Sequence, residues 1–319
     1  MSDATPGAAT PGDLAAVVDL GTNTFHLLVG RCTADGIEEV ARERHFVRVA
    51  SDGIDRIGEL PYARAVAAAE SMGRVLAQYP GIPRAGFATA ALRTASNGPE
   101  LRERLSAALG VDIEIIDGDR EAGLIAAAVL SARLPPAPRY LIMDIGGGSV
   151  EFILAEGGRT LYRESFPVGA QVLRQRFHKG EPFGKTPDAP QRATLMEYLD
   201  GVLAPLLASC GFDPVQLVGS SGTFDVLADL YGIGYAPGVH TITPQLCEGL
   251  YAEACAMTEA QRLGDPRIPD DRADMIVVAL ALIDWVLVRL PQQQIVTCAY
   301  ALKEGALLEL CSGRGVGGV

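Results

Sequence analysis

The sequence predicts an α/β protein built from two similar halves, and two observations lead to this prediction. Helix and strand patterns alternate along the 319 residues, which is typical of sheets covered by helices. One strand, turn and strand pattern also occurs twice, and a shift of 125 residues places Asp19 on Asp144 and Gly21 on Gly146. At roughly 150 residues per domain, the chain is long enough for two domains.

The first half opens on a hairpin with a polar turn. Apolar strands flank Gly21-Thr22-Asn23-Thr24, and apolar residues three or four positions apart mark the helices that follow. In chain order we expect strands over 15–19 and 25–29, helices over 61–79 and 99–109, a strand over 111–116 and a helix over 119–133. Three prolines within 134–138 exclude regular structure, so the predicted boundary between the halves lies there.

The second half repeats this pattern. Strands over 140–144 and 150–154 flank the turn Gly146-Gly147-Gly148-Ser149 and form a second hairpin. Further on we expect helices over 169–177, 190–209 and 224–231, a strand over 215–218, a helix that begins at Thr243-Pro244, a buried helix over 272–290 and a last helix over 301–310. Two halves that each begin with a hairpin are expected to enclose a cleft.

The overall charge argues against nucleic acid as a partner. Asp and Glu number 39 against 27 Lys and Arg, which gives a formal net charge of −12. No basic run offers the footprint that a polynucleotide needs. A small polyanion would therefore have to be bound by local donors or by a bridging metal ion.

The termini and the apolar segments predict a cytoplasmic protein without a membrane partner. Residues 1–13 have neither the charged nor the apolar part of a secretory signal. The most apolar stretch, 275–283, is far shorter than the ~20 residues that cross a bilayer. The six cysteines show no C-x-x-C pair and no metal-ligand spacing, so we expect reduced thiols that serve mainly in packing.

The turn over Gly146-Gly147-Gly148-Ser149 is the strongest chemical signal in the sequence. Three glycines let backbone N–H groups approach an anion, and Ser149 adds a hydroxyl group. Asp144 at its base and Glu151 just beyond it are suited to hold Mg²⁺ beside a phosphate. The alternative is an ordinary glycine-rich turn in which Asp144 makes a local hydrogen bond.

The other candidate residues each have a structural alternative. The run Ser221-Gly222-Thr223 at a strand-to-helix junction suits an anion or a simple helix cap. Glu121 lies in the first turn of a predicted helix, where acidic residues are common because the helix dipole favours them. Arg93 follows the apolar run 86–92, which we expect to be a strand, and at the end of that strand it suits either a phosphate or solvent. The histidines form no visible ligand cluster, so each is expected to be structural.

Several of these motifs together resemble the exopolyphosphatase and guanosine pentaphosphate phosphohydrolase (Ppx/GppA) family. The matching segments are 17–26, 116–125 around Arg120-Glu121-Ala122, 144–151, 221–223 and Leu302-Lys303-Glu304-Gly305, in this order. The resemblance implies two ribonuclease-H-like domains of the actin-like ATPase superfamily around a central cleft. It also implies that the final helix returns to the first half, so we expect a first domain over 15–134 plus about 300–311 and a second domain over 135–299. From their composition we expect a disordered arm over 1–14 and a flexible tail over 312–319.

The resemblance also assigns roles to residues. Glu121 would be the general base and would activate water for metal-dependent hydrolysis of a terminal phosphoanhydride. Asp144, Glu151 and Asp19 would hold Mg²⁺. The phosphate ligands would be Thr22, Asn23, Thr24, Arg93, Gly146, Gly147, Gly148, Ser149, Ser221, Gly222 and Thr223.

The resemblance implies polyphosphate or guanosine polyphosphate as substrate and a homodimer as a plausible assembly. It does not extend to the helical C-terminal region of the longer exopolyphosphatases, nor to processive hydrolysis of long polymer. Two other functions stay open at this point. One is a kinase of the same superfamily, because the fold serves both reactions. The other is a non-catalytic sensor of a phosphorylated nucleotide.

Overall fold

A computed structural model describes residues 14–33, 36–177, 190–211 and 213–312. The chain divides into two compact units. Unit 1 runs to Ser131 and includes the chain from Tyr300 onward, and unit 2 spans Ala132–Ala299. Of the predicted arm and tail, only Leu14 and Ser312 lie within the described residues.

Unit 1 is built on a five-stranded sheet with the order β3-β2-β1-β4-β5. Its strands are β1 (Leu14–Leu20), β2 (Thr24–Thr33), β3 (Gly36–Phe46), β4 (Arg84–Ala88) and β5 (Ile113–Ile115). Its helices are α1 (Glu59–Leu76), α2 (Ala90–Thr94), α3 (Gly98–Leu109), α4 (Gly118–Ser131) and α12 (Leu302–Cys311). β1 pairs with β2 in antiparallel and with β4 in parallel fashion.

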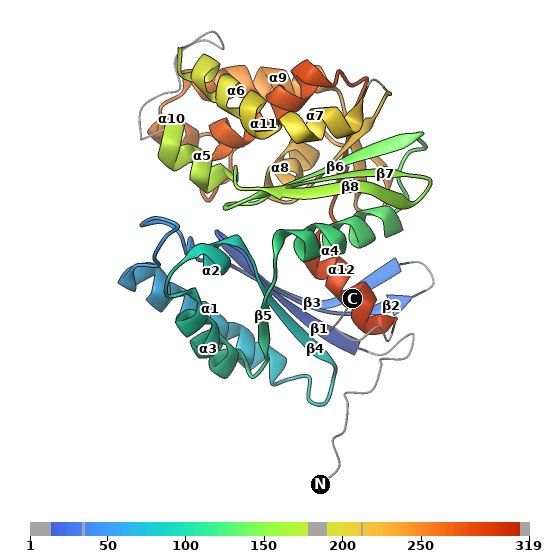
Figure 1. Ribbon diagram of the computed structural model, residues 1–319. Helices are drawn as coiled ribbons and strands as arrows, with labels where there is room; N and C mark the ends of the chain where they lie inside the picture. Colours follow the sequence, from blue (N-terminus) through green and yellow to red (C-terminus); the bar gives the residue numbers. More distant parts are fainter. Residues whose placement is uncertain (1–13, 34–35, 178–189, 212, 313–319) are drawn as a thin grey trace. The chain divides into compact units, whose positions relative to one another are not determined.

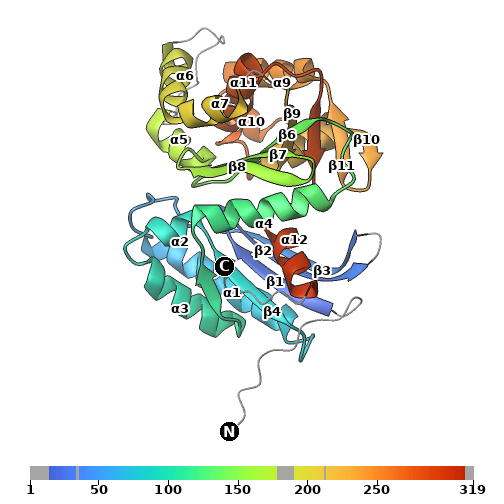
Figure 2. The same cartoon turned by 45° about the vertical axis from the view of Figure 1, so that its right-hand side comes forward.

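Helices cover both faces of this sheet. Helices α1 and α3 lie on one face, and α4 and α12 lie on the other (Figures 1 and 2). Side chains alternate along a strand, so the buried strand β1 is apolar on both sides. Val18 joins the core with α1 and α3, while Val17 is buried on the opposite face. The burial of both faces explains why β1 reads as a continuous apolar run.

Unit 2 contains a seven-stranded sheet with the order β10-β11-β12-β9-β6-β7-β8. Its strands are β6 (Arg139–Ile145), β7 (Val150–Glu156), β8 (Arg159–Phe166), β9 (Gln216–Ser220), β10 (Ile233–Ala236), β11 (Val239–Ile242) and β12 (Ile295–Cys298). Its helices are α5 (Ala170–Phe177), α6 (Pro190–Val202), α7 (Ala204–Cys210), α8 (Gly222–Tyr231), α9 (Pro244–Ala256), α10 (Glu259–Leu263) and α11 (Ile276–Arg289). Helix α11 is the central buried helix of this unit, and its only tryptophan, Trp285, is fully buried.

Both predicted hairpins form, as β1 with β2 and as β6 with β7. Two expectations about helices were wrong. The helix predicted over 190–209 is divided into α6 and α7, because Pro205 occupies the start of a new helix. The helix predicted from residue 272 begins only at Ile276. Among the strands, β3, β8, β10, β11 and β12 were not predicted. The strand expected over 86–92 was wrong at its end, because β4 ends at Ala88 and Arg93 lies in the short helix α2.

The expectation that all six cysteines are reduced was also wrong. Cys32 in β2 and Cys311 at the end of α12 form a disulfide, with Cα atoms 6.1 Å apart. The two residues are separated by 279 positions in sequence, so spacing gave no sign of the pair. The other four cysteines are buried and not disulfide-bonded. Burial raises the pKa of the Cys247 thiol to about 12, as expected of a packing residue.

Helix α12 returns to unit 1 and packs closely on α4. At Gly305 the two helices approach so closely that an added Cβ would overlap the carbonyl of Leu124. Arg120 of α4 also donates to both carboxylate oxygens of Glu309 in α12, at 2.7 and 2.5 Å. The hydrogen bonds that Arg120 donates to Glu309 raise the pKa of Arg120 above its ordinary value. The return helix is therefore fixed to α4 at two places.

We expect Gly305→Ala to destabilise the protein by about 1–3 kcal/mol, because the new methyl group overpacks the contact between α4 and α12. Gly249→Ala is the matched control, since Gly249 lies within helix α9 with nothing within 4 Å of an added Cβ. Without a clash, alanine should leave stability unchanged or raise it by up to ~1 kcal/mol. Urea unfolding of both variants measures the difference. Equal changes in the free energy of unfolding for the two variants would contradict a tight contact between α4 and α12 at Gly305.

Within the part of the chain that the structure describes, no helix has the length and hydropathy needed to cross a bilayer.

Candidate functional site

The polar turn of unit 1 is held by backbone hydrogen bonds. The N–H of Gly21 donates to the carbonyl of Thr24 at 3.1 Å. The carbonyl of Asn23 accepts from the N–H groups of Val47 and Arg48, and the carbonyl of Thr22 accepts from Val49. The segment after β3 therefore holds two successive carbonyl groups of the turn.

The glycine-rich turn of unit 2 is held in the same way. The N–H of Gly146 donates to the carbonyl of Ser149 at 3.0 Å, which matches the bond in the first turn. The carbonyls of Gly146, Gly147 and Gly148 accept N–H groups from residues 169–171 at the start of α5. A side chain at Gly169 would overlap Gly147, so glycine is required for this close approach.

These contacts determine where the N–H groups of the two turns point. In a trans peptide the N–H lies opposite the carbonyl of the preceding residue. The N–H groups of Gly147, Gly148 and Ser149 therefore point away from α5, and those of Asn23 and Thr24 point away from the segment 47–49. Successive N–H groups that point to one side form a site suited to an anion.

Two buried carboxylates lie directly opposite each other beside the turn of unit 2. Asp144 in β6 is the register partner of Glu151 in β7, so both side chains lie on the same face of the sheet. Their residues are 5% and 1% exposed. Like charges in directly opposite positions are unfavourable, and burial increases the cost. Two adjacent buried carboxylates destabilise a hairpin that has only a structural role, and they suit a cation.

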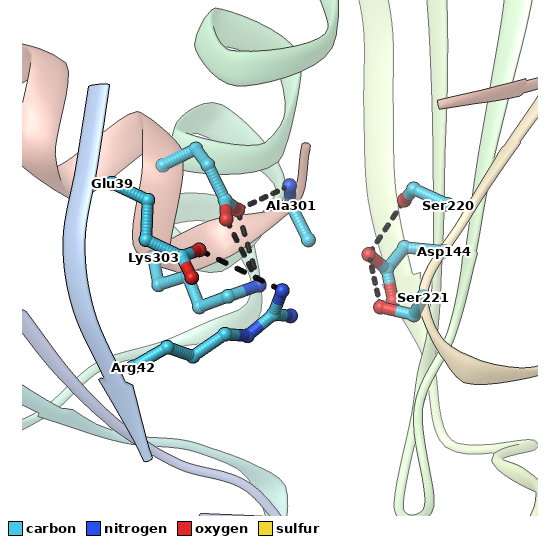
Figure 3. Close-up of polar contacts among 8 residues, drawn as sticks. Glu39, Arg42, Asp144, Ser220, Ser221, Ala301 and Lys303 are labelled. Atoms are coloured by element: carbon cyan, nitrogen blue, oxygen red, sulfur yellow. Dashed lines mark hydrogen bonds and ion pairs between the residues drawn. The ribbon is translucent and has the colours of Figure 1, made fainter. Parts of the chain in front are cut away.

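The hydroxyl groups of three serines bind these carboxylates. Ser220 and Ser221 both donate to Oδ2 of Asp144, at 2.7 and 2.9 Å (Figure 3). Ser165 in β8 donates to Oε1 of Glu151 at 2.6 Å. Ser221 precedes α8, yet its side chain makes no capping hydrogen bond. The helix-cap alternative for Ser221 is therefore wrong, because its hydroxyl group binds Asp144 instead.

The N-terminus of α8 lies beside an arginine that sequence reasoning missed. A Cβ at Gly222 would overlap the guanidinium group of Arg272, so glycine leaves room for the arginine. The side chain of Arg272 is 17% exposed. The N-terminus of a helix and a guanidinium group both favour an anion. No local signal marks Arg272 as an anion ligand in the sequence, because it stands at the start of the apolar run over 272–290 that predicts a buried helix.

In unit 1 the structure brings Glu121 and Arg93 together. Nη1 of Arg93 lies 3.2 Å from Oε2 of Glu121 and also donates to the carbonyl of Ile116 at 2.6 Å. The Glu121 side chain is 9% exposed, so the arginine compensates a buried charge. Arg93 is 28% exposed, and the alternative in which it merely faces solvent is wrong.

The start of α4 and the start of α12 are both capped by acidic side chains. Asp117 accepts from the N–H of Arg120 at 2.8 Å, which fixes the turn that carries Glu121. Glu304 accepts from the N–H of Ala301 at 2.8 Å and lies 3.1 Å from Nζ of Lys303 (Figure 3). Lys303 and Glu304 are both buried. The cap, the ion pair and their burial give Lys303 and Glu304, two residues of the motif over 302–305, a structural role.

Asp19 has a different partner from its counterpart Asp144. Its register partner in β2 is His26, where the second hairpin has Glu151. Asp19 lies on the face of the sheet that α4 and α12 cover, since it shares that face with Val17. The described residues contain no group of three or more His, Cys, Asp or Glu side chains that could hold a metal ion.

Each unit thus gathers part of the predicted site. Unit 1 brings together Glu121 and Arg93, and unit 2 brings together Asp144, Glu151 and Ser221. That both sets act on one substrate stays a prediction, as do the direct phosphate contacts of Thr22, Asn23, Thr24, Arg93, Gly146, Gly147, Gly148, Ser149, Ser221, Gly222 and Thr223. Ser165, Ser220 and Arg272 were not predicted, and their places depend on strand register and loop packing.

Comparison with known proteins supports the fold and the family. The model of the Ppx/GppA phosphatase family matches residues 28–312. An exopolyphosphatase from Cytophaga hutchinsonii is 34% identical, and its crystal structure has a TM-score of 0.88 over 96% of this chain and 100% of that chain. The Aquifex aeolicus PPX-GPPA enzyme is 20% identical, with a TM-score of 0.74 over 93% and 99% of the two chains.

A curated relative is longer. The guanosine-5'-triphosphate,3'-diphosphate pyrophosphatase of Vibrio campbellii is 27% identical over 304 residues, which are 93% of this chain and 59% of the relative. This chain therefore spans less than two thirds of that protein. The structural similarities and the two helix-covered sheets confirm the predicted α/β fold. Since the family match extends over most of the chain, the protein belongs to the Ppx/GppA phosphatase family.

Proposed function

We propose that this chain hydrolyses the terminal phosphoanhydride bond of inorganic polyphosphate or guanosine pentaphosphate. The observation that carries the proposal is the buried pair Asp144 and Glu151 beside a turn with outward N–H groups. The names of the relatives add support: one is an exopolyphosphatase and another a guanosine pentaphosphate pyrophosphatase. Both substrates end in the same phosphoryl group.

The carboxylate pair fits Mg²⁺. Mg²⁺ is commonly held by one or two carboxylates together with substrate phosphates and water. Asp144 and Glu151 would supply the carboxylates, with Asp19 as a further candidate ligand. When bound, the ion would stabilise the negative charge on the phosphoryl oxygens in the transition state. A bound cation would also relieve the repulsion between the two carboxylates.

Glu121 is the proposed general base. Its carboxylate would accept a proton from the attacking water, a contribution of about 10²- to 10⁴-fold in rate. Arg93 supports this role because its guanidinium group holds Oε2 of Glu121 at 3.2 Å and compensates the buried charge. The same arginine retains further N–H donors for a phosphoryl oxygen.

Backbone and hydroxyl donors would bind the phosphates. We assign this role to the turn residues Thr22, Asn23, Thr24, Gly146, Gly147, Gly148 and Ser149, and to Gly222 and Thr223 at the N-terminus of α8. Phosphoryl transfer needs chiefly positioning and charge stabilisation, which such donors supply. Ser221 contributes through Asp144, because its hydroxyl group donates to that carboxylate.

A phosphate-release panel tests the proposal. The full chain is incubated with tripolyphosphate, long-chain polyphosphate, guanosine pentaphosphate and ATP, with and without Mg²⁺, and free orthophosphate is measured. We expect Mg²⁺-dependent release from polyphosphate or guanosine pentaphosphate. Transfer of the phosphoryl group to an organic acceptor would favour a kinase. Binding of guanosine pentaphosphate without turnover would favour a sensor.

A further inference from the structure

The strands of unit 2 align four polar residues in one row across the sheet. Asp144 in β6 pairs with Ser220 in β9 on one side and with Glu151 in β7 on the other, and Glu151 pairs with Ser165 in β8. Register partners lie on the same face. The row therefore reads serine, aspartate, glutamate, serine, with the two hydroxyl groups flanking the two carboxylates.

Each flanking hydroxyl group binds the carboxylate next to it. Ser220 donates to Oδ2 of Asp144 at 2.7 Å, and Ser165 donates to Oε1 of Glu151 at 2.6 Å. Ser221 adds a second bond to the same Oδ2 atom. One oxygen of each carboxylate is thus held by serine on the side away from the other carboxylate. The hydroxyl groups thereby fix the orientation of the two neighbouring carboxylates.

The backbone at Ser221 indicates that this arrangement has a cost. Ser221 has a φ of 69° and a ψ of 173°, a backbone region almost restricted to glycine that costs another residue about 1–3 kcal/mol. Its side chain also makes no capping hydrogen bond to the first turn of α8. Ser220 is fully buried, where a hydroxyl group needs a partner. The backbone conformation of Ser221 and the burial of the Ser220 hydroxyl group are both explained if these hydroxyl groups are needed to hold the Asp144 carboxylate.

We propose that Ser165 and Ser220, assisted by Ser221, are positioning residues that orient the Asp144 and Glu151 carboxylates to bind one divalent cation together. The inference rests on the proposed function, since that function places Mg²⁺ at these carboxylates. Groups that hydrogen-bond metal ligands typically change metal affinity by about 10- to 100-fold when they are removed. A merely structural role would change stability and leave the affinity for the cation unchanged.

The test is Mn²⁺ binding to the full chain without substrate, measured by electron paramagnetic resonance. We expect Ser165→Ala and Ser220→Ala each to weaken Mn²⁺ binding about tenfold or more. Ser165→Thr keeps the hydroxyl group on a half-buried strand residue and should restore the affinity. Ser209→Ala is the matched control, because the Ser209 hydroxyl group binds the carbonyl of Pro205 in α7.

Kinetics give a second readout. In the two alanine variants, the Mg²⁺ concentration needed for half-maximal phosphate release should rise about tenfold. The turnover number at saturating Mg²⁺ should fall much less, because Asp144 and Glu151 are still present. Circular dichroism shows whether the fully buried Ser220→Ala variant folds. If it does not, the pair Ser165→Ala and Ser165→Thr decides the question.

The outcomes separate this inference from the proposed function. Wild-type Mn²⁺ affinity in Ser165→Ala and Ser220→Ala would overturn the positioning role and leave the proposed hydrolysis intact. Failure of Ser165→Thr to restore binding would also overturn it. Absence of Mn²⁺ binding in the wild-type protein would overturn the metal site, and the positioning role with it.

Discussion

Replacing Glu121 by glutamine is expected to lower the turnover number for phosphate release at least a hundredfold. Glutamine has nearly the same shape and can still accept a hydrogen bond from Arg93, but it cannot take a proton from water. The loss corresponds to the contribution of a general base, roughly 3 to 5 kcal/mol of transition-state stabilisation. Substrate binding should change little, because the phosphate-binding donors remain.

The measurement compares kcat and substrate affinity in Glu121→Gln and in a control variant. Glu103→Gln is a suitable control, since Glu103 lies in the same unit with a side chain that is 73% exposed. We expect wild-type kinetics for the control. Wild-type turnover in Glu121→Gln would remove Glu121 from the mechanism, and a loss of binding without a loss of kcat would make it a substrate ligand instead.

Asp144→Asn is expected to abolish most of the Mg²⁺-dependent activity. The substitution keeps the size of the side chain but removes one of the two charges that would hold the cation. Loss of several kcal/mol of metal stabilisation lowers the rate by about 10²- to 10³-fold. Glu151→Gln should have a similar effect, because the two carboxylates are direct register partners. Phosphate release over a range of Mg²⁺ concentrations measures both variants.

Stability should change in the opposite direction from activity. Without metal, Asp144→Asn removes the repulsion between two buried carboxylates, and its amide can donate to Glu151 while its oxygen accepts from Ser220. The melting temperature of the metal-free variant should therefore equal or exceed that of the wild type. Asp270→Asn, at an exposed position of unit 2, is the control and should alter neither the activity nor the melting temperature. A large fall in melting temperature for Asp144→Asn would contradict the repulsion.

The hairpins could be predicted from the sequence because their information is local. Apolar strands flank a short polar turn in each, and the equivalence of Asp19 with Asp144 and of Gly21 with Gly146 corresponds to the same turn hydrogen bond. The direction in which the N–H groups of the turns point could not be predicted in this way. It depends on the segments that hold their carbonyls, residues 47–49 and the start of α5, which lie far from the turns in sequence.

The partners of the carboxylates could not be predicted, because strand order and register decide them. Ser165 reaches Glu151 only because β8 pairs with β7, and Ser220 reaches Asp144 only because β9 pairs with β6 across 76 positions. The contact between Arg272 and Gly222 and the Cys32–Cys311 disulfide likewise join distant segments. Patterns of apolar spacing describe single elements and contain no such pairings.

Hydrolysis of tripolyphosphate in water enriched in ¹⁸O tests most directly whether this chain uses water to attack a terminal phosphoryl group. We expect one labelled oxygen atom in each orthophosphate released, only when Mg²⁺ is present, and at least a hundredfold more slowly in Glu121→Gln. Release of unlabelled orthophosphate, with the label in the shortened chain, would contradict attack at the terminal phosphorus.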